Sequence, residues 1–282
     1  DKNNNLWIGT EDAGLNKLNM KDHSYTSFND MKGLSQNCIH GLASIDNHLW
    51  IGTHANGIDL MDIRTEKIIK HYTISVNPYA NKNDIIVYLY KLQNNDLLVA
   101  TALGVYQYNS QKDIFEKLSQ FPNNCRIQTL FEDHDGVIWA GTSNKGLYYY
   151  NPTTSQHGEF KLDTVNTSRT INNIYEDRKN NLWFATGDGI KIYDRSTQQT
   201  TKYDMQDGLP SNVIYRIEED KKAKAQAVAE RPQVIRETKT VYVNNTPRSS
   251  SSSSGSNSET YAGTSQGTTQ KQGMSKAAKG TI

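Results

Sequence analysis

Cysteine and long hydrophobic runs are both scarce in this 282-residue sequence. Its two cysteines, Cys38 and Cys125, are too few for a disulfide framework or a thiolate metal site, and we expect two small, half-buried apolar side chains. No apolar run approaches the roughly 18 residues that a membrane-spanning helix requires. Residues 1–5 are polar and do not resemble a signal peptide, so the targeting segment of an exported protein would lie outside this sequence.

Positive charge is also scarce in the first 220 residues, which hold 21 Lys and Arg against 27 Asp and Glu. Because nucleic-acid binding needs clustered cations, we do not expect DNA or RNA as a partner of this segment. Residues 221–282 differ sharply, with ten basic against three acidic residues and no Trp or Phe. The sequence therefore predicts two parts, a globular segment over 1–220 and a tail over 221–282.

The tail lacks the apolar residues that a core requires. It includes six consecutive serines at 249–254, followed by Gly, Ser, Thr, Gln and Asn. Such a composition cannot offset the entropy lost on ordering, so we expect residues 235–282 to be disordered apart from an extended stretch at 240–243. A basic tail could touch anionic lipid or nucleic acid, but charges spread among neutral residues favour a solvated linker.

A short repeated block is the strongest feature that the sequence does contain. Four copies carry tryptophan, and a fifth has leucine at that position; successive copies are 43, 48, 41 and 44 residues apart. This period is typical of the four-stranded blades of a β-propeller. The blocks are Asn-Leu-Trp-Ile-Gly-Thr at 5–10, His-Leu-Trp-Ile-Gly-Thr at 48–53, Asp-Leu-Leu-Val-Ala-Thr at 96–101, Val-Ile-Trp-Ala-Gly-Thr at 137–142 and Asn-Leu-Trp-Phe-Ala-Thr at 181–186.

Each repeat is expected to supply four strands bounded by polar or glycine-bearing turns. Apolar pairs such as Ile39 and Leu42 mark the first strand, the block forms the second, and segments such as 146–150 and 159–162 form the third and fourth. The large side chains should fill the wedge between blades. The repeat positions assigned to this packing role are Trp7, Trp50, Leu98, Trp139 and Trp183, with sugar-stacking platforms as the less favoured alternative for the tryptophans.

The number of blades is left open by the sequence. Residues 1–28 supply only the last three strands of a blade, whereas residues 212–220 supply only a first strand. Pairing of the two chain ends would close a five-bladed ring and remove exposed edges. The alternative is an arc of a larger ring.

The repeats resemble the two-component regulator propeller family. The resemblance rests on Gly-Leu-Pro-Ser-Asn-Val-Ile-Tyr-Arg-Ile-Glu-Glu-Asp at 208–220, on Glu176-Asp177 followed by the block at 181–186, and on Gly-Leu-Ser-Gln-Asn-Cys-Ile at 33–39. It implies a seven-bladed periplasmic sensor region of a hybrid histidine kinase from Bacteroidetes, with further receptor domains or a second receptor chain as partners. The family's ligands include oligosaccharides. Five repeat cores depart from this pattern, and residues 223–226 break the sixth.

No enzyme chemistry is apparent in the repeats. The sequence has no His-Glu-x-x-His and no Gly-x-x-x-x-Gly-Lys-Ser/Thr, and Gly187-Asp188-Gly189 reads as a turn. A histidine-kinase helix is also absent. The sequence therefore predicts a non-catalytic chain without a cofactor.

Metal ligands do not gather in the sequence. Asp133-x-Asp135-Gly136 resembles part of a calcium loop but lacks the later glutamate. The seven histidines occupy different repeat positions, whereas a metal site needs several ligands converging on one point. We therefore expect singly placed histidines and no metal site.

Ligand contacts are expected from loops on one face of the propeller, because the loops joining second to third strands and one blade to the next share that face. Their amides, carboxylates and cations suit hydrogen bonds to hydroxyl-rich ligands, although exposed loops are generally polar. The main candidates are Glu11, Asp12, His54, Asn56, Asn144, Lys145, Arg169 and Asp188. The inter-blade loops add Asn29, Asp30, Tyr79, Asn83, Asn123, Asn166 and Asp207.

These observations favour a signal-sensing module that binds an oligosaccharide or another small ligand and regulates an attached kinase. One alternative is a propeller enzyme, a lyase or glycan-active protein, which would require a His, Arg, Glu or Tyr cluster facing one pocket. The other is a protein-interaction scaffold, for which the loop face would be flat.

Overall fold

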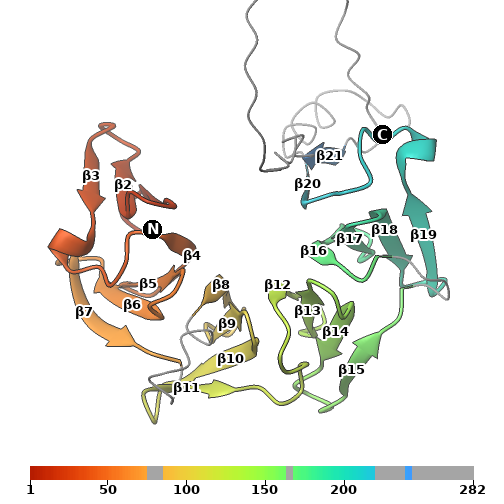
Figure 1. Cartoon of the computed structure of the whole chain (residues 1–282), viewed down its shortest axis with the longest axis horizontal. Coiled ribbons are helices and arrows are strands. Elements are labelled where there is room, and N and C mark those ends of the chain that lie inside the picture. Colours follow the sequence, from red (N-terminus) through yellow and green to blue (C-terminus); the bar gives the residue numbers. More distant parts are fainter. Residues whose placement is uncertain (75–84, 163–167, 220–238, 243–282) are drawn as a thin grey trace, which may run out of the picture.

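The computed structural model describes residues 1–74, 85–162, 168–219 and 239–242. Its strands form antiparallel sheets that follow one another around an arc, with the first strand of each sheet nearest the centre (Figure 1). The fold is therefore an all-β propeller built from four-stranded blades, as the repeats predict. Residues 75–84, 163–167, 220–238 and 243–282 lie outside the described structure, and with them most of the tail predicted from the sequence.

Four sheets have four strands each and follow the chain order predicted from the repeats. A three-stranded sheet precedes them, and β20 follows them. The strands are β1 (Asn5–Gly9), β2 (Leu15–Asn19) and β3 (Tyr25–Phe28); β4 (Ile39–Ile45), β5 (His48–Thr53), β6 (Ile58–Asp62) and β7 (Lys67–Tyr72); β8 (Ile86–Lys91), β9 (Leu97–Thr101), β10 (Gly104–Asn109) and β11 (Ile114–Lys117); β12 (Ile127–Glu132), β13 (Ile138–Thr142), β14 (Leu147–Tyr150) and β15 (His157–Phe160); β16 (Ile171–Glu176), β17 (Leu182–Thr186), β18 (Gly189–Asp194) and β19 (Gln199–Tyr203); and β20 (Arg216–Glu219).

The two ends of the arc do not join into one sheet. The first blade and β20 lie on opposite sides of an opening in Figure 1. β20 instead pairs antiparallel with β21 (Lys239–Tyr242), which matches the extended stretch expected at 240–243. Of the two arrangements that the sequence allows, the structure shows the open arc.

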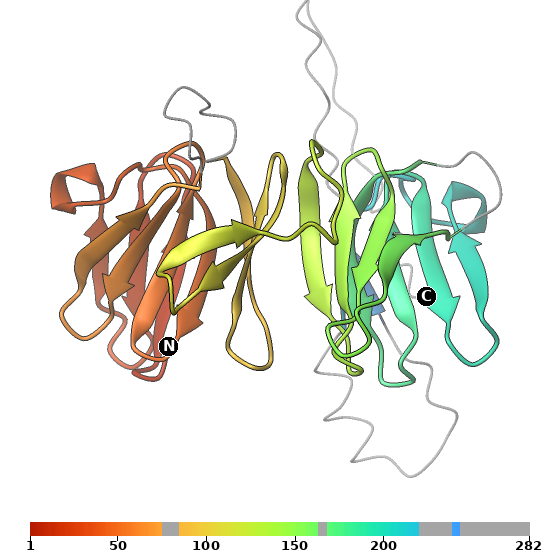
Figure 2. The same cartoon turned by 90° about the horizontal axis from the view of Figure 1, so that it is seen from below.

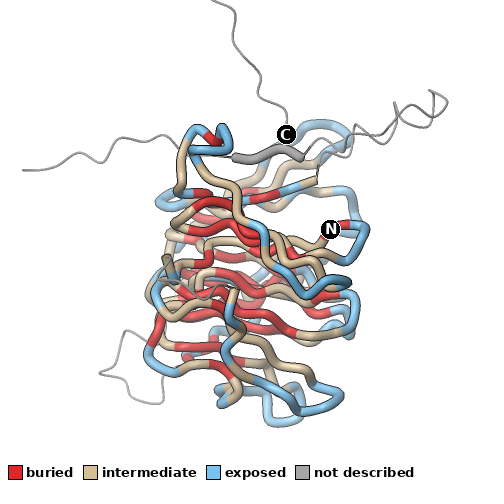
Figure 3. The backbone as a smooth tube through the Cα atoms, turned by 90° about the vertical axis from the view of Figure 1, so that its right-hand side faces the viewer, coloured by how far each residue is buried: buried red, intermediate tan, exposed pale blue. Residues whose placement is uncertain are grey.

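Neighbouring blades are held together by apolar clusters that span each junction. The first strand of one blade contacts the first strand of the next, and buried residues run through successive sheets (Figure 3). Trp50 and Trp139 are each only 5% exposed at these junctions, and Leu98 is fully buried. Trp7 and Trp183, in the two outermost repeats, are half-buried against their own clusters. Large side chains thus fill the wedges between blades, which leaves the two buried tryptophans unable to stack on a ligand.

Three of the tryptophans are tied to an aspartate six residues earlier. The indole N–H of Trp139 donates to Asp133 at 2.7 Å, that of Trp183 to Asp177 at 2.8 Å, and that of Trp7 to Asp1 at 2.7 Å. Each aspartate also accepts backbone amides of the turn that leads into the tryptophan strand. These bonds explain the polar turn before the repeat block, including the segment at 133–136 that resembles a calcium loop.

Trp50 lacks such an aspartate and lies instead in an aromatic group with Tyr72, Tyr108 and Phe115. The hydroxyls of Tyr72 and Tyr108 both donate to Asp113 at 2.7 Å, and Lys70 forms an ion pair with the same carboxylate. Because Lys70 and Asp113 belong to different sheets, this group fastens two blades together.

Asp113 gives the fold a defined response to acid. Hydrogen bonds from Lys70, Tyr72 and Tyr108 lower the pKa of Asp113 from 3.8 to about 2. Since the folded-state pKa lies below the unfolded value, the stabilisation is present above about pH 4 and is lost as the pH falls through about 2. We expect Asp113→Asn to show a flatter dependence of unfolding free energy on pH across that window, measured by urea denaturation. Parallel curves for the two proteins would contradict this assignment.

Candidate functional site

One face of the arc is built by two kinds of loop that bond to each other. Backbone amides in the turns between second and third strands donate to carbonyls of the inter-blade loops: Gly14 to Asn37 at 2.9 Å, Gly146 to Arg169 at 2.8 Å and Gly189 to Asn212 at 2.6 Å. The short 3-10 turns of two inter-blade loops, η1 (Asp30–Lys32) and η2 (Met205–Asp207), lie along the same upper edge in Figure 2. We call this surface the loop face.

The threonine that ends each repeat block holds these turns in place. The hydroxyl of Thr53 donates to the carbonyl of Gly57 at 2.9 Å and accepts the amide of Asn56 at 3.0 Å. Equivalent pairs of bonds occur at Thr10, Thr101, Thr142 and Thr186. The repeated threonine therefore fixes the backbone of the loop face and leaves the turn side chains free to vary.

The opposite face serves to fasten the blades. Glutamates at the ends of β12 and β16 accept bonds from the turn of the preceding blade: Glu132 from the amide of Gln93 at 2.7 Å, and Glu176 from that of His134 at 2.9 Å. Glu219 forms the corresponding contact with Arg178. These three glutamates link neighbouring blades, whereas the loop face also presents exposed polar side chains, which makes it the better location for a ligand.

Four of the predicted ligand residues are themselves tied into the loop face. Asn56 donates to the carbonyl of Ser35 at 2.8 Å, and Lys145 to that of Asn123 at 3.0 Å. Arg169 forms an ion pair with Glu159, and Asp188 accepts Lys202 at 2.9 Å. Asn56 and Lys145 link neighbouring loops, and Arg169 and Asp188 link a loop to the fourth strand of a blade, so a ligand that engaged these four side chains would compete with the contacts they already make.

The other four predicted residues, Glu11, Asp12, His54 and Asn144, are exposed on the loop face. Glu11, Asp12 and His54 lie on neighbouring turns, whereas Asn144 is two blades further along the arc. Among the additional inter-blade candidates, Asn29 is half-buried and the others described are exposed: Asp30, Asn123 and Asp207. Tyr79, Asn83 and Asn166 lie outside the described residues.

The inner strands contribute residues that the sequence reasoning missed. Each of β4, β8, β12 and β16 has an irregularity in its pairing at the second residue, which is left without a partner in register. Such a bulge re-aims a side chain. The four residues are His40, Val87, Gln128 and Asn172. The side chains of His40 and Asn172 bond the backbone carbonyl that begins the next blade, Ile86 and Ile214 respectively, at 2.9 and 2.8 Å.

Two tyrosines near the centre of the arc expose aromatic surface. Tyr88 on β8 is 39% exposed, and Tyr215, just before β20, is 52% exposed. Exposed aromatic faces suit the apolar face of a sugar ring, while loop amides and carboxylates suit its hydroxyls. The alternation of polar and apolar residues predicts these strands. It does not show that Tyr88 and Tyr215, unlike other tyrosines, lie near the centre of the arc.

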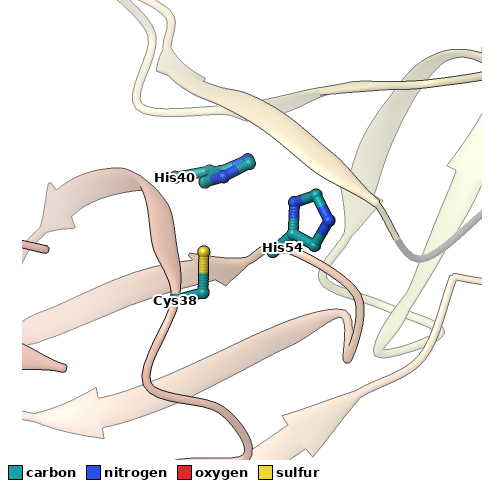
Figure 4. A group of neighbouring side chains, drawn as sticks. All are labelled: Cys38, His40 and His54. Atoms are coloured by element: carbon teal, nitrogen blue, oxygen red, sulfur yellow. The ribbon is translucent and has the colours of Figure 1, made fainter. Parts of the chain in front are cut away.

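Three potential metal ligands also meet on the loop face. Ligand atoms of Cys38, His40 and His54 all lie within 4.8 Å of one another (Figure 4). The rings of His40 and His54 are 4.8 Å apart at an interplanar angle of 69°. The expectation of singly placed histidines is therefore wrong for these two. The Cys-x-His spacing at 38–40 was the available signal, but the sequence does not reveal that His54 joins it.

The thiol of Cys38 experiences negative charge from the adjacent turn. Burial raises the pKa of Cys38, and the carboxylates of Glu11 and Asp12 raise it further. Burial also raises the pKa of Cys125, which lies at a different junction, and both cysteines are free thiols. Burial and the two carboxylates therefore both disfavour the thiolate of Cys38 relative to the thiol.

Repeated four-stranded sheets, inner-strand bulges and threonine-anchored turns define the chain as a β-propeller repeat protein. The family model for the two-component regulator propeller matches residues 120–144 and 167–188. Over these residues the chain matches two-component regulator propeller repeats, as the sequence predicted.

Known proteins with similar sequences are much longer. Histidine kinase P4 of Formosa agariphila is 28% identical over 275 residues, an alignment that covers 75% of this chain and 20% of that protein. The extracellular domain of the putative hybrid two component system BT3049 from B. thetaiotaomicron superposes with a TM-score of 0.62 at 26% identity, covering 77% of this chain and 29% of that one. The chain thus spans less than a third of each.

The propeller fold is also shared with an enzyme. Virginiamycin B lyase from Staphylococcus aureus superposes with a TM-score of 0.60 at 17% identity, covering 77% of this chain and 71% of the lyase. At this identity the likeness concerns the fold alone. A Gly-x-Ser-x-Gly string occurs at 263–267, outside both the repeats and the described residues. None of the helices in the described residues has the length and hydropathy of a membrane span.

Proposed function

We propose that this chain is the ligand-sensing propeller segment of a bacterial two-component receptor, and that it recognises an oligosaccharide on its loop face and inner strands. The observation that carries the proposal is that the two faces use their polar side chains differently. Glu132 and Glu176 on one face link neighbouring blades, whereas the loop face has a hydrogen-bonded backbone and presents exposed polar side chains, among them Glu11, Asp12, His54 and Asn144.

The chemistry of the loop face suits a neutral, hydroxyl-rich ligand. Asn144 offers an amide, Glu11 and Asp12 offer carboxylates, and Tyr88 and Tyr215 offer aromatic faces closer to the centre. A sugar ring combines hydroxyls with one apolar face, so it can use all three kinds of group. The relatives named as two-component systems and histidine kinases support a signalling role for such binding.

Signalling would require the rest of the receptor. In this proposal the propeller lies in the periplasm, and ligand binding biases an attached histidine kinase toward one of two states. A ligand shifts such an equilibrium only through its different affinity for the two states. The partners are therefore the remaining receptor domains or a second receptor chain, and the extracellular position of the BT3049 domain supports this location.

The direct test is isothermal titration calorimetry of the full chain with a panel of oligosaccharides, followed by mass analysis of each ligand. Circular dichroism first establishes that the protein is folded. We expect one or more oligosaccharides to bind and to be recovered unchanged. Recovery of cleaved or eliminated sugar would establish the propeller enzyme instead, and a folded protein that binds none would establish the interaction scaffold.

Tyr88→Ala should weaken sugar binding by about 10-fold, the equivalent of about 1.4 kcal/mol, because it removes an aromatic platform from the inner strand β8. Tyr25→Ala is the matched control, since Tyr25 is 62% exposed on the outermost strand of the first blade. Titration of both variants with the same oligosaccharide measures the difference. Equal affinities for the two variants would exclude the inner strand from the binding surface.

A further inference from the structure

The group formed by Cys38, His40 and His54 has a chemistry that sugar binding does not use. A thiolate and two imidazoles form a ligand set of intermediate softness that suits zinc, whereas Mg²⁺ and Ca²⁺ prefer oxygen ligands. We propose that these three residues form a binding site for a divalent transition metal, Zn²⁺ by preference, with a fourth coordination position open to water.

The geometry requires little rearrangement. With zinc–ligand bonds of 2.0–2.3 Å, a tetrahedral ion holds its sulfur and nitrogen ligands roughly 3.5 Å apart. The three ligand atoms already lie within 4.8 Å of one another. His54 is exposed, which gives its side chain room to rotate toward the half-buried Cys38 and His40.

One of the histidines is already oriented as a metal ligand. The Nδ1 atom of His40 lies 2.9 Å from the carbonyl oxygen of Ile86, which can only accept a hydrogen bond. The proton of the neutral ring is therefore on Nδ1, and the lone pair is on Nε2. Metal-bound histidines commonly donate their second ring nitrogen to a carbonyl in this way, because the bond fixes both tautomer and orientation.

The propeller repeat itself does not require a cysteine at 38 or a histidine at 54. The amide of His54 donates to the carbonyl of Cys38 at 2.9 Å, and the same backbone bond recurs in three other blades. In those blades the donor and acceptor pairs are Ala102 and Ile85, Ser143 and Arg126, and Gly187 and Thr170. Since the backbone geometry is kept with quite different side chains, packing does not account for a cysteine and a histidine here.

Cobalt titration of the full chain tests the site, because a thiolate ligand gives Co²⁺ a charge-transfer band in the near ultraviolet. The protein is reduced, freed of metal with a chelator and titrated with Co²⁺ followed by Zn²⁺. We expect the band to saturate at one cobalt per chain and to disappear when zinc displaces the cobalt. Absence of the band from the wild-type protein would overturn the proposal.

Single substitutions assign the ligands. Cys38→Ser should abolish the band, and His40→Gln and His54→Gln should each weaken binding by at least about 10- to 100-fold, the loss typical of removing even an outer partner of a metal. Cys125→Ser and His157→Gln, at other positions, are the matched controls and should bind as wild type. A band that survives in Cys38→Ser, or vanishes in Cys125→Ser, would contradict the site. Unchanged binding in either His40→Gln or His54→Gln would contradict the three-ligand arrangement. These measurements need no sugar, so their outcome does not depend on whether the proposed sensing role is correct.

Discussion

Asp133→Ala should destabilise the chain by about 3–5 kcal/mol, the cost of breaking a buried charge network by removing one partner. The Asp133 carboxylate is fully buried and accepts four bonds: from the Trp139 indole, from Arg195 of the next blade, and from the amides of Asp135 and Val137. Its loss leaves the buried indole N–H and the amides of the turn without an acceptor, and it releases the link to the next blade. Urea denaturation followed by tryptophan fluorescence measures the loss.

Asp135→Ala provides the control for this effect. The Asp135 side chain is 56% exposed and contacts the same arginine, Arg195, at 3.1 Å. An exposed pair of this kind contributes about 0–1 kcal/mol. If the two variants lose similar amounts of stability, the buried aspartate–tryptophan pair is not the support that the repeated spacing indicates.

Gly57→Ala should cost about 2–5 kcal/mol, because the substitution meets both a conformational and a steric obstacle. Gly57 has a φ of 74°, a left-handed conformation that costs other residues about 1–2 kcal/mol. A Cβ atom there would lie 2.2 Å from the carbonyl oxygen of Tyr72, so the end of strand β7 would have to shift. Such overpacking adds about 1–3 kcal/mol. The loss is measured by urea denaturation of the full chain.

Gly136→Ala separates the two contributions. Gly136 has nearly the same φ, 75°, but a Cβ atom there would have nothing within 4 Å. This variant should therefore lose only the conformational part, about 1–2 kcal/mol. Equal losses in Gly57→Ala and Gly136→Ala would show that the turn of the loop face does not pack against the end of the fourth strand.

The strand order was predictable because the repeat imposes the same local chemistry on each blade. The structure places β4 at the apolar pair beginning with Ile39 and β5 at the block over 48–53. The turn after β5 contains the glycine expected there. Strand bounds were less predictable. The first strand expected over 212–220 is limited among the described residues to Arg216–Glu219, the four residues that pair with β21.

Features that depend on contacts between separate segments could not be derived from one strand or turn at a time. His40 lies on β4 and His54 in the turn after β5 of the same blade, and a bulge at His40 together with that turn brings their rings together. The alternation of polar and apolar residues carries no signal for a bulge of this kind. The choice between a closed ring and an open arc is similar, because it depends on the angle between successive sheets and not on the residues of any one strand.

The location of the ligand is the central claim, and hydrogen–deuterium exchange of the full chain with and without the oligosaccharide that binds most tightly tests it most directly. We expect slower exchange in peptides of the loop face, such as those covering 10–14, 53–57 and 186–189, and unchanged exchange in the turns of the opposite face at 93–96 and 134–136. Slower exchange confined to the opposite face would contradict the account.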